Sequence, residues 1–127
     1  MCGIAGIHLR DESLVPQLGS LMYEMVEGIV VRGPDSAGMA IYGDRERLPE
    51  DYSSVSLLNA PEDIQQRLTE KLPDADVGIE ELAETTFIRA KVKSEELAEV
   101  VREAAPDAMV IGTGDDSVVY KGVGNPM

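Results

Sequence analysis

The sequence holds one cysteine, one histidine and no tryptophan among its 127 residues. One cysteine forms no internal disulfide, and Cys2 with His8 cannot complete a zinc site within one chain. No apolar run approaches the roughly 20 residues that a bilayer-spanning helix needs. Residues 1–9 also lack the basic leader and cleavage site of a signal peptide. We therefore expect no metal, no other cofactor and no membrane span, and a cytoplasmic location.

Basic residues are also scarce. The chain carries 11 lysines and arginines against 24 aspartates and glutamates, which gives a formal net charge of -13. Such a charge repels nucleic acid and anionic membrane surfaces. It indicates an acidic, solvated surface, and a source adapted to high salt is an additional explanation. Nucleic acid is excluded as a partner.

The first third of the chain predicts a strand, a helix and a strand. Residues 3–9 mix β-branched residues with glycines, as in a buried strand that lies close to other backbone. Apolar residues between 14 and 29 recur at helical spacing, and Ser13 is the expected cap. The turn at 32–35 ends this helix, and 37–42 then predicts a second strand.

The remainder predicts a small α/β module with the order β-α-β-α-β-β. Strands are expected at 53–58 and 85–92, and helices at 61–72 and from Ser94, as the cap, to Pro106. A hairpin is expected at 108–113 and 117–121, joined by the turn at 114–116. The polar stretch 43–50 is the expected boundary between the two halves.

Cys2 directly follows the initiator methionine, which is readily removed when the next residue is small. Removal leaves a thiol and a free α-amine on one residue. The thiolate can attack an amide carbon while the amine, with a pKa of about 7.7 to 8.0, moves the proton. By itself a cysteine at this position is more often a small buried residue than a nucleophile.

Two segments change that balance, namely MCGIAGI at 1–7 and RGPDSAG at 32–38. Together they resemble the start of the class II glutamine amidotransferases, which are N-terminal-nucleophile glutaminases. The resemblance is greatest to separate amidotransferase subunits of glutamate synthase-like and N-methylglutamate synthase systems. It implies that glutamine is the substrate, and that its side-chain amide is hydrolysed to glutamate and ammonia through a cysteine thioester.

The resemblance assigns roles to three residues. Cys2 is the nucleophile and supplies the α-amine base, Gly3 lets the backbone approach the substrate, and Arg32 holds the catalytic terminus in place. Arg32 also has a plainer interpretation as a helix-end cation that binds the last carbonyls. Asp35 and the serine after it are expected to build the turn, and His8 is expected to be a packed or edge residue of the first strand.

The implied fold class is α+β, the beginning of the αββα sandwich of the N-terminal-nucleophile hydrolases, interrupted by the small α/β module. The expected divisions are 1–50 for the start of the amidotransferase domain, 51–122 for the insert and 123–127 for a truncated continuation. Family members continue to a His-Thr-Arg segment that holds the substrate carboxylate and to an Asn-Gly oxyanion hole, and neither occurs here. The sequence therefore predicts the front part of a longer domain.

Three functions remain open. In the first, the chain is the nucleophile-bearing part of a glutaminase, completed by a missing C-terminal part or by a synthase subunit that accepts the ammonia. In the second, it is a binding or regulatory subunit without catalysis. In the third, it is a structural partner of a synthase. The incomplete sheet predicts an unpaired edge, and with it oligomerisation with itself or pairing with a partner.

Overall fold

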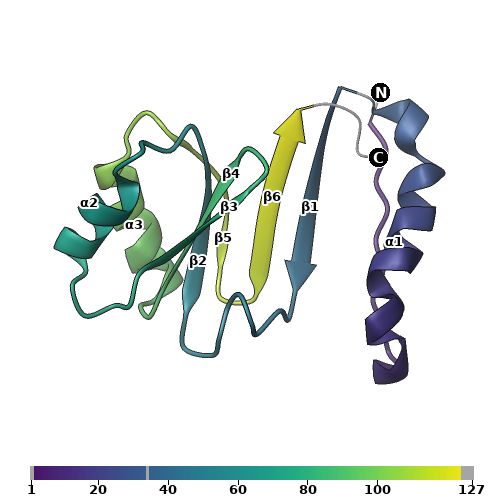
Figure 1. The fold of residues 1–127 in the computed structure, drawn as a ribbon, viewed down its shortest axis with the longest axis horizontal. Coiled ribbons are helices and arrows are strands. Elements are labelled where there is room, and N and C mark those ends of the chain that lie inside the picture. Colours follow the sequence, from purple (N-terminus) through teal and green to yellow (C-terminus); the bar gives the residue numbers. More distant parts are fainter. Residues whose placement is uncertain (1, 34, 124–127) are drawn as a thin grey trace. The chain divides into compact units, whose positions relative to one another are not determined.

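The structure is a computed structural model that describes residues 2–33 and 35–123. The chain forms two compact units (Figure 1). The first contains the described residues up to Ala37 together with Val123, and the second is Gly38–Gly122. No helix among the described residues combines the length and the apolar character that crossing a membrane requires.

The first unit opens with an extended segment rather than a strand. From Cys2 to Leu9 the residues alternate between exposed and half-buried, which is the period of a strand. None of the described residues forms a ladder with this segment. The predicted strand at 3–9 is therefore absent, because a strand is completed only by a hydrogen-bonded neighbour, which this part of the chain does not supply.

A 3₁₀ helix, η1 (Glu12–Gln17), leads into α1 (Leu18–Glu27), and a short 3₁₀ turn, η2 (Val30–Arg32), follows. Asp11 begins η1: its Oδ1 accepts hydrogen bonds from the Ser13 backbone N–H at 2.9 Å and from the Ser13 hydroxyl at 2.7 Å. These bonds hold the pKa of the Asp11 carboxyl below its usual value. The prediction that Ser13 caps this helix is wrong, because the carboxylate upstream accepts both of its donors.

The apolar residues of α1 are half-buried or exposed, and the half-buried ones are Leu18, Leu21, Met22 and Val26. None of its residues is buried, and Tyr23 is 58% exposed. The helical spacing of apolar residues is confirmed, but the burial that such spacing normally indicates is not found among the described residues.

The second unit contains the small module. Its strands are β2 (Ser53–Leu58), β3 (Gly78–Leu82), β4 (Thr85–Ala90) and β5 (Met109–Gly114), and its helices are α2 (Ile64–Lys71) and α3 (Ser94–Ala104). The sheet order is β3-β4-β2-β5, and every neighbouring pair is antiparallel. A β-α-β-β-α-β chain of this kind is the ferredoxin-like arrangement. The predicted order β-α-β-α-β-β is wrong, because the prediction does not include β3 and counts β6 as part of the module.

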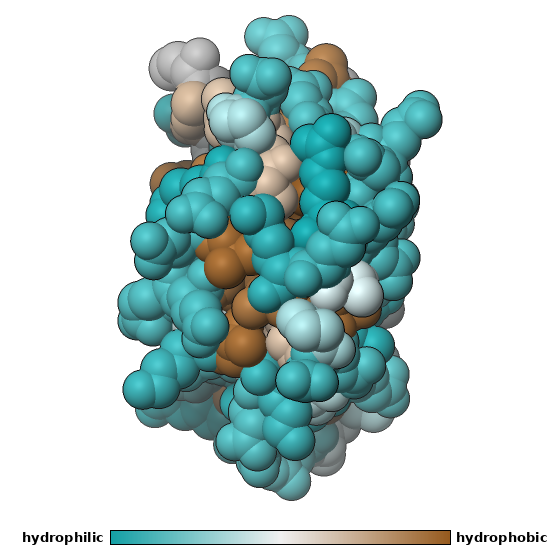
Figure 2. Space-filling model, turned by 90° about the vertical axis from the view of Figure 1, so that its left-hand side faces the viewer, coloured by the Kyte–Doolittle hydropathy of each residue, from teal (hydrophilic) through white to brown (hydrophobic). Residues whose placement is uncertain are grey.

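Both helices pack on one face of this sheet. Val55 and Leu57 on β2 alternate with serines and join Ile88 of β4 in one buried cluster. The helices contribute the buried residues Ile64 and Leu68 from α2, and Leu97, Ala98, Val101 and Ala104 from α3. Figure 2 views the molecule from the side on which α2 and α3 lie in Figure 1, and hydrophilic residues cover most of that face. The predicted cap of α3 is off by one residue, since Lys93 is the N-cap and Ser94 is already helical.

On the opposite face of the sheet lies β6 (Ser117–Val123), which pairs with β1 (Ser36–Tyr42) in a separate two-stranded ribbon. The Ser54 hydroxyl donates to the Ser117 carbonyl at 2.8 Å, and the Lys121 N–H donates to Thr85 Oγ1 at 2.7 Å. Phe87 joins the ribbon to the sheet in a second buried cluster with Leu48 and Val118. The predicted hairpin is wrong, because β5 and β6 belong to different sheets.

Gly112 allows β5 and β6 to approach closely. A Cβ placed on Gly112 would lie 2.8 Å from both Cβ and Cγ2 of Val119. We expect Gly112→Ala to lower the free energy of unfolding by about 1–3 kcal/mol through overpacking, measured by urea denaturation. Gly122→Ala is the matched control on β6, since its added Cβ meets only the Ala83 Cβ at 4.0 Å. Equal stability of the two variants would contradict this packing.

The polar stretch 43–50 is anchored within the second unit. The Gly43 N–H donates to the Asp116 carbonyl at 3.1 Å, and Arg45 forms an ion pair with Asp116 at 3.2 Å. Arg47 pairs with Asp44 at 3.1 Å and with Glu80 at 3.2 Å. Leu48 is only 1% exposed. The stretch is thus a fixed part of the unit, while the domain limits 1–50, 51–122 and 123–127 stay predictions.

Asp44 makes the anchoring sensitive to acid. Burial raises the pKa of its carboxyl, but hydrogen bonds from Arg47 and the Glu46 N–H outweigh burial and leave the pKa below the ordinary 3.8. The unfolded chain therefore binds this proton more readily, so the contribution is present above pH 3.8 and is lost as pH falls through the folded pKa. We expect Asp44→Asn to cost up to about 1 kcal/mol at neutral pH.

The measurement is urea denaturation of the wild type and Asp44→Asn at pH 7 and at about pH 3, below the reference carboxyl pKa. The stability difference between the two proteins should shrink on acidification. A difference that is the same at both pH values would contradict the assignment.

Candidate functional site

Cys2 lies on the extended segment at the start of the first unit. Its side chain is exposed and forms no disulfide. Met1, whose removal would free the α-amine of Cys2, lies outside the described residues. An exposed thiol on an extended chain is sterically open to a substrate carbonyl, as a nucleophile requires.

Gly3 brings Cys2 next to the turn that carries Arg32. A Cβ on Gly3 would lie 3.1 Å from the Ile29 Cβ and 3.4 Å from the Arg32 Cβ. Two of the predicted site positions, Gly3 and Arg32, are thus brought together within one unit. Packing against Ile29 gives a reason for glycine here besides approach of a substrate, and no sequence signal pointed to Ile29.

Arg32 is the last residue of η2. Its backbone N–H donates to the Ile29 carbonyl at 3.0 Å, and the residue is exposed. Pro34, which belongs to the predicted turn, lies outside the described residues. Asp35 is exposed at a bend, as expected for the turn, whereas Ser36 is already the first residue of β1 and not part of the turn.

His8 lies on the same extended segment as Cys2. Because it is exposed, it is not the packed histidine of a buried strand. Among the described residues, no three or more His, Cys, Asp or Glu side chains gather closely enough to hold a metal ion.

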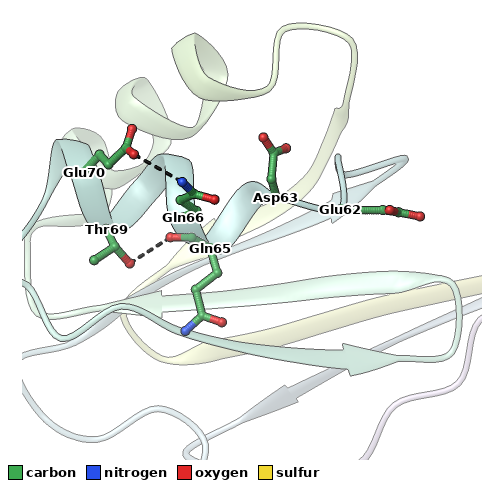
Figure 3. Close-up of a pocket in the computed structure, with 6 residues that line it drawn as sticks. All are labelled: Glu62, Asp63, Gln65, Gln66, Thr69 and Glu70. Carbon is green, nitrogen blue, oxygen red and sulfur yellow. Dashed lines mark hydrogen bonds between the residues drawn. The ribbon is translucent and has the colours of Figure 1, made fainter.

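A surface depression lies elsewhere, at the start of α2 and along it in the second unit (Figure 3). It is shallow and is lined by Glu62, Asp63, Gln65, Gln66, Thr69 and Glu70. The Thr69 hydroxyl donates to the Gln65 carbonyl at 2.7 Å, and Gln66 donates to Glu70 at 3.5 Å. In Figure 3 these side chains point in different directions rather than toward one centre. Such a surface does not position reacting groups.

Comparisons with known proteins connect the chain to amidotransferases. It is 37% identical over 130 residues to the "Glutamine amidotransferase-like protein GlxB" of Rhizobium meliloti, an alignment that covers 99% of this chain and 42% of GlxB. It is 46% identical over 52 residues to a "Putative glutamine amidotransferase" of Methanothermobacter thermautotrophicus, covering 41% of this chain and 17% of that protein. The chain thus spans less than half the length of these relatives.

No protein-family model matches the chain, and no solved structure matches it. The relationship that the comparisons show is to two curated proteins whose names refer to glutamine amidotransferases.

Proposed function

We propose that this chain carries the nucleophile of a class II glutamine amidotransferase of the N-terminal-nucleophile type. The exposure of Cys2, beside a Gly3 that packs against Arg32, is the observation that carries the proposal. The names of two relatives support glutamine as the substrate. These two lines of support are independent, because the exposure of Cys2 is a feature of the structure and the relatives are found by sequence identity.

The reaction begins at the Cys2 thiolate. The thiolate attacks the side-chain amide carbon of glutamine, and the α-amine of Cys2 moves the proton to the departing nitrogen, which leaves as ammonia. A glutamyl thioester on Cys2 remains. Water then attacks the thioester carbon and releases glutamate, returning the thiol. In this proposal Arg32 and Gly3 hold the catalytic terminus in position.

The rest of the site comes from further protein. The extended segment 2–9 has the exposure pattern of a strand but no described neighbour, and no residue of α1 is buried. Both features support an αββα sandwich completed by the remainder of the amidotransferase domain. That remainder supplies the His-Thr-Arg segment and the Asn-Gly oxyanion hole. Loss of one hydrogen-bond donor from an oxyanion hole typically lowers kcat by about 10²–10³-fold.

The ammonia passes to an acceptor on a synthase domain or subunit. Separate amidotransferase subunits of glutamate synthase-like and N-methylglutamate synthase systems provide the closest parallel, and a cytoplasmic enzyme without metal or cofactor fits this role. Self-association through the unpaired segment 2–9 is part of the same proposal.

A glutamine-mimicking electrophile tests the site. Mass spectrometry first establishes whether the mature protein begins at Cys2, because only then is the α-amine free. The electrophile is then added to the processed enzyme containing the whole amidotransferase domain. We expect one adduct, on Cys2, that excess glutamine prevents and that Cys2→Ala abolishes.

The second candidate is a binding or regulatory subunit without catalysis. A processed, complete protein that gives no adduct would support this candidate and overturn the glutaminase.

A further inference from the structure

The ferredoxin-like sheet has two outer strands, and only one of them carries charge. On β3, two of the five residues are glutamates. Glu80 pairs with Arg47 at 3.2 Å, and Glu81 accepts from the Thr86 hydroxyl at 3.1 Å. Charged residues of this kind protect a sheet edge from pairing with another chain.

β5 lacks this protection. Its sequence, MVIGTG, contains no charged residue and no proline. Met109 is 60% exposed and Thr113 is also exposed. Because β5 is the terminal strand of its sheet, no described residue forms a ladder with its outer edge. The register with β2 shifts within this strand, so Ile111 has no opposite residue on β2; the shift lies on the inner side of β5 and places no charge on its outer edge.

A hollow lies beside the first half of β5. It has a volume of about 460 Å³ and is lined by Arg102, Ala105, Pro106, Ala108 and Val110. Strand addition uses such hollows for alternate side chains of the added strand, while the main-chain bonds supply affinity. The edge therefore offers both parts of a strand-recognition surface.

The charges around the edge decide what can pair there. Asp107 and Asp115 flank β5 and are exposed. The cations beside them are Arg102, which lines the hollow, and Arg45, which pairs with Asp116 at 3.2 Å. A second copy that paired antiparallel, with Met109 opposite Gly114, would bring Asp107 opposite Asp116. Like charges directly opposite destabilise a pair of strands, and each copy also carries a net charge of -13.

We propose that the outer edge of β5 binds an extended segment of a partner protein, with a short uncharged core and basic residues at its ends. The segment adds as a further strand beside β5 and places an aliphatic side chain in the hollow. This interaction is separate from the chemistry of Cys2, so it stands or fails independently of the glutaminase.

The probe is a synthetic peptide of alternating valine and threonine flanked by lysines, added to the full chain. We expect amide exchange at residues 109–114 to slow when the peptide is bound. A peptide of equal charge with proline at its centre is the control for non-specific attraction, and it should leave exchange unchanged. Cys2→Ala should bind the strand peptide as the wild type does.

Lysines on the edge provide the second measurement. The double variant Met109→Lys with Thr113→Lys should weaken peptide binding by at least about tenfold. Gln65→Lys with Thr69→Lys adds the same charge on α2 and should weaken it far less. Equal weakening by both pairs, or unchanged exchange at 109–114, would overturn the proposal. So would a dimer of the chain that the β5 lysines dissociate, since a second copy would then occupy the edge.

Discussion

Replacing Cys2 by alanine is expected to lower kcat for glutamine hydrolysis by at least about 10³-fold in the complete enzyme. Removal of a catalytic nucleophile commonly costs this much or more, because the remaining groups cannot substitute for the covalent step. The measurement is the release of glutamate and ammonia from glutamine by the processed protein. Cys2→Ser should also be strongly impaired, since a serine hydroxyl is far less ionised than a thiol at neutral pH.

His8→Ala is the matched control for this prediction. His8 is exposed on the same extended segment and is the only histidine of the chain. If the α-amine of Cys2 is the base, His8→Ala should keep most of the activity. Equal losses in Cys2→Ala and His8→Ala would instead assign the proton transfer to an imidazole. Retained activity in Cys2→Ala would contradict a cysteine nucleophile altogether.

Local periodicity was sufficient to predict the elements with a buried face. The strand predicted at 53–58 matches β2, where Val55 and Leu57 alternate with serines. The helix beginning near Ser94 was predicted from apolar residues at 97, 100, 101 and 104; of these, all but the half-buried Val100 are buried. Such patterns are readable because one side of each element meets the core.

β3 was missed for the opposite reason. Its sequence places Glu80 and Glu81 side by side, which breaks the alternation of a half-buried strand. These residues serve an edge position, where charge is favourable and only one neighbouring strand is present. An outer strand stabilised by ion pairs leaves little trace in hydrophobic periodicity.

The pairing of β1 with β6 could not be predicted locally. Residues 36–42 and 117–123 are separated by the whole ferredoxin-like module, and the turn at Gly114 has the composition of a hairpin turn. The small residues Ser54 and Gly112, on the face that receives β6, were the available signal. Small side chains on a sheet indicate close approach of other backbone, but not which backbone.

The candidate site was predicted in part. The positions of Gly3 and Arg32 came from two motifs, and the structure brings these residues together. The role of Cys2 as nucleophile stays a prediction. The prediction of a strand at 3–9 is wrong. The sequence specifies the alternation of exposed and half-buried residues, but a strand also needs a hydrogen-bonded neighbour, which no described residue provides.

Replacing Phe87 by alanine is expected to lower the free energy of unfolding by about 3–5 kcal/mol. Phe87 is the only phenylalanine, is 1% exposed and packs with Leu48 and Val118 between the four-stranded sheet and the β1–β6 ribbon. A small domain typically has about 5–15 kcal/mol in total. The loss therefore removes a large share of the stability of this unit, and the measurement is urea denaturation followed by circular dichroism.

Tyr42→Ala provides the control, because it also removes an aromatic ring but from a side chain that is 71% exposed on β1. Its effect should remain within about 0.5 kcal/mol. Because the helices and Phe87 lie on opposite faces of the sheet, amide exchange in Phe87→Ala should rise first in β6 and later in β2. If Phe87→Ala is no less stable than Tyr42→Ala, the β1–β6 ribbon does not share a hydrophobic core with the sheet. The stretch around Leu48 would then be held by the ion pairs of Arg45 and Arg47 alone.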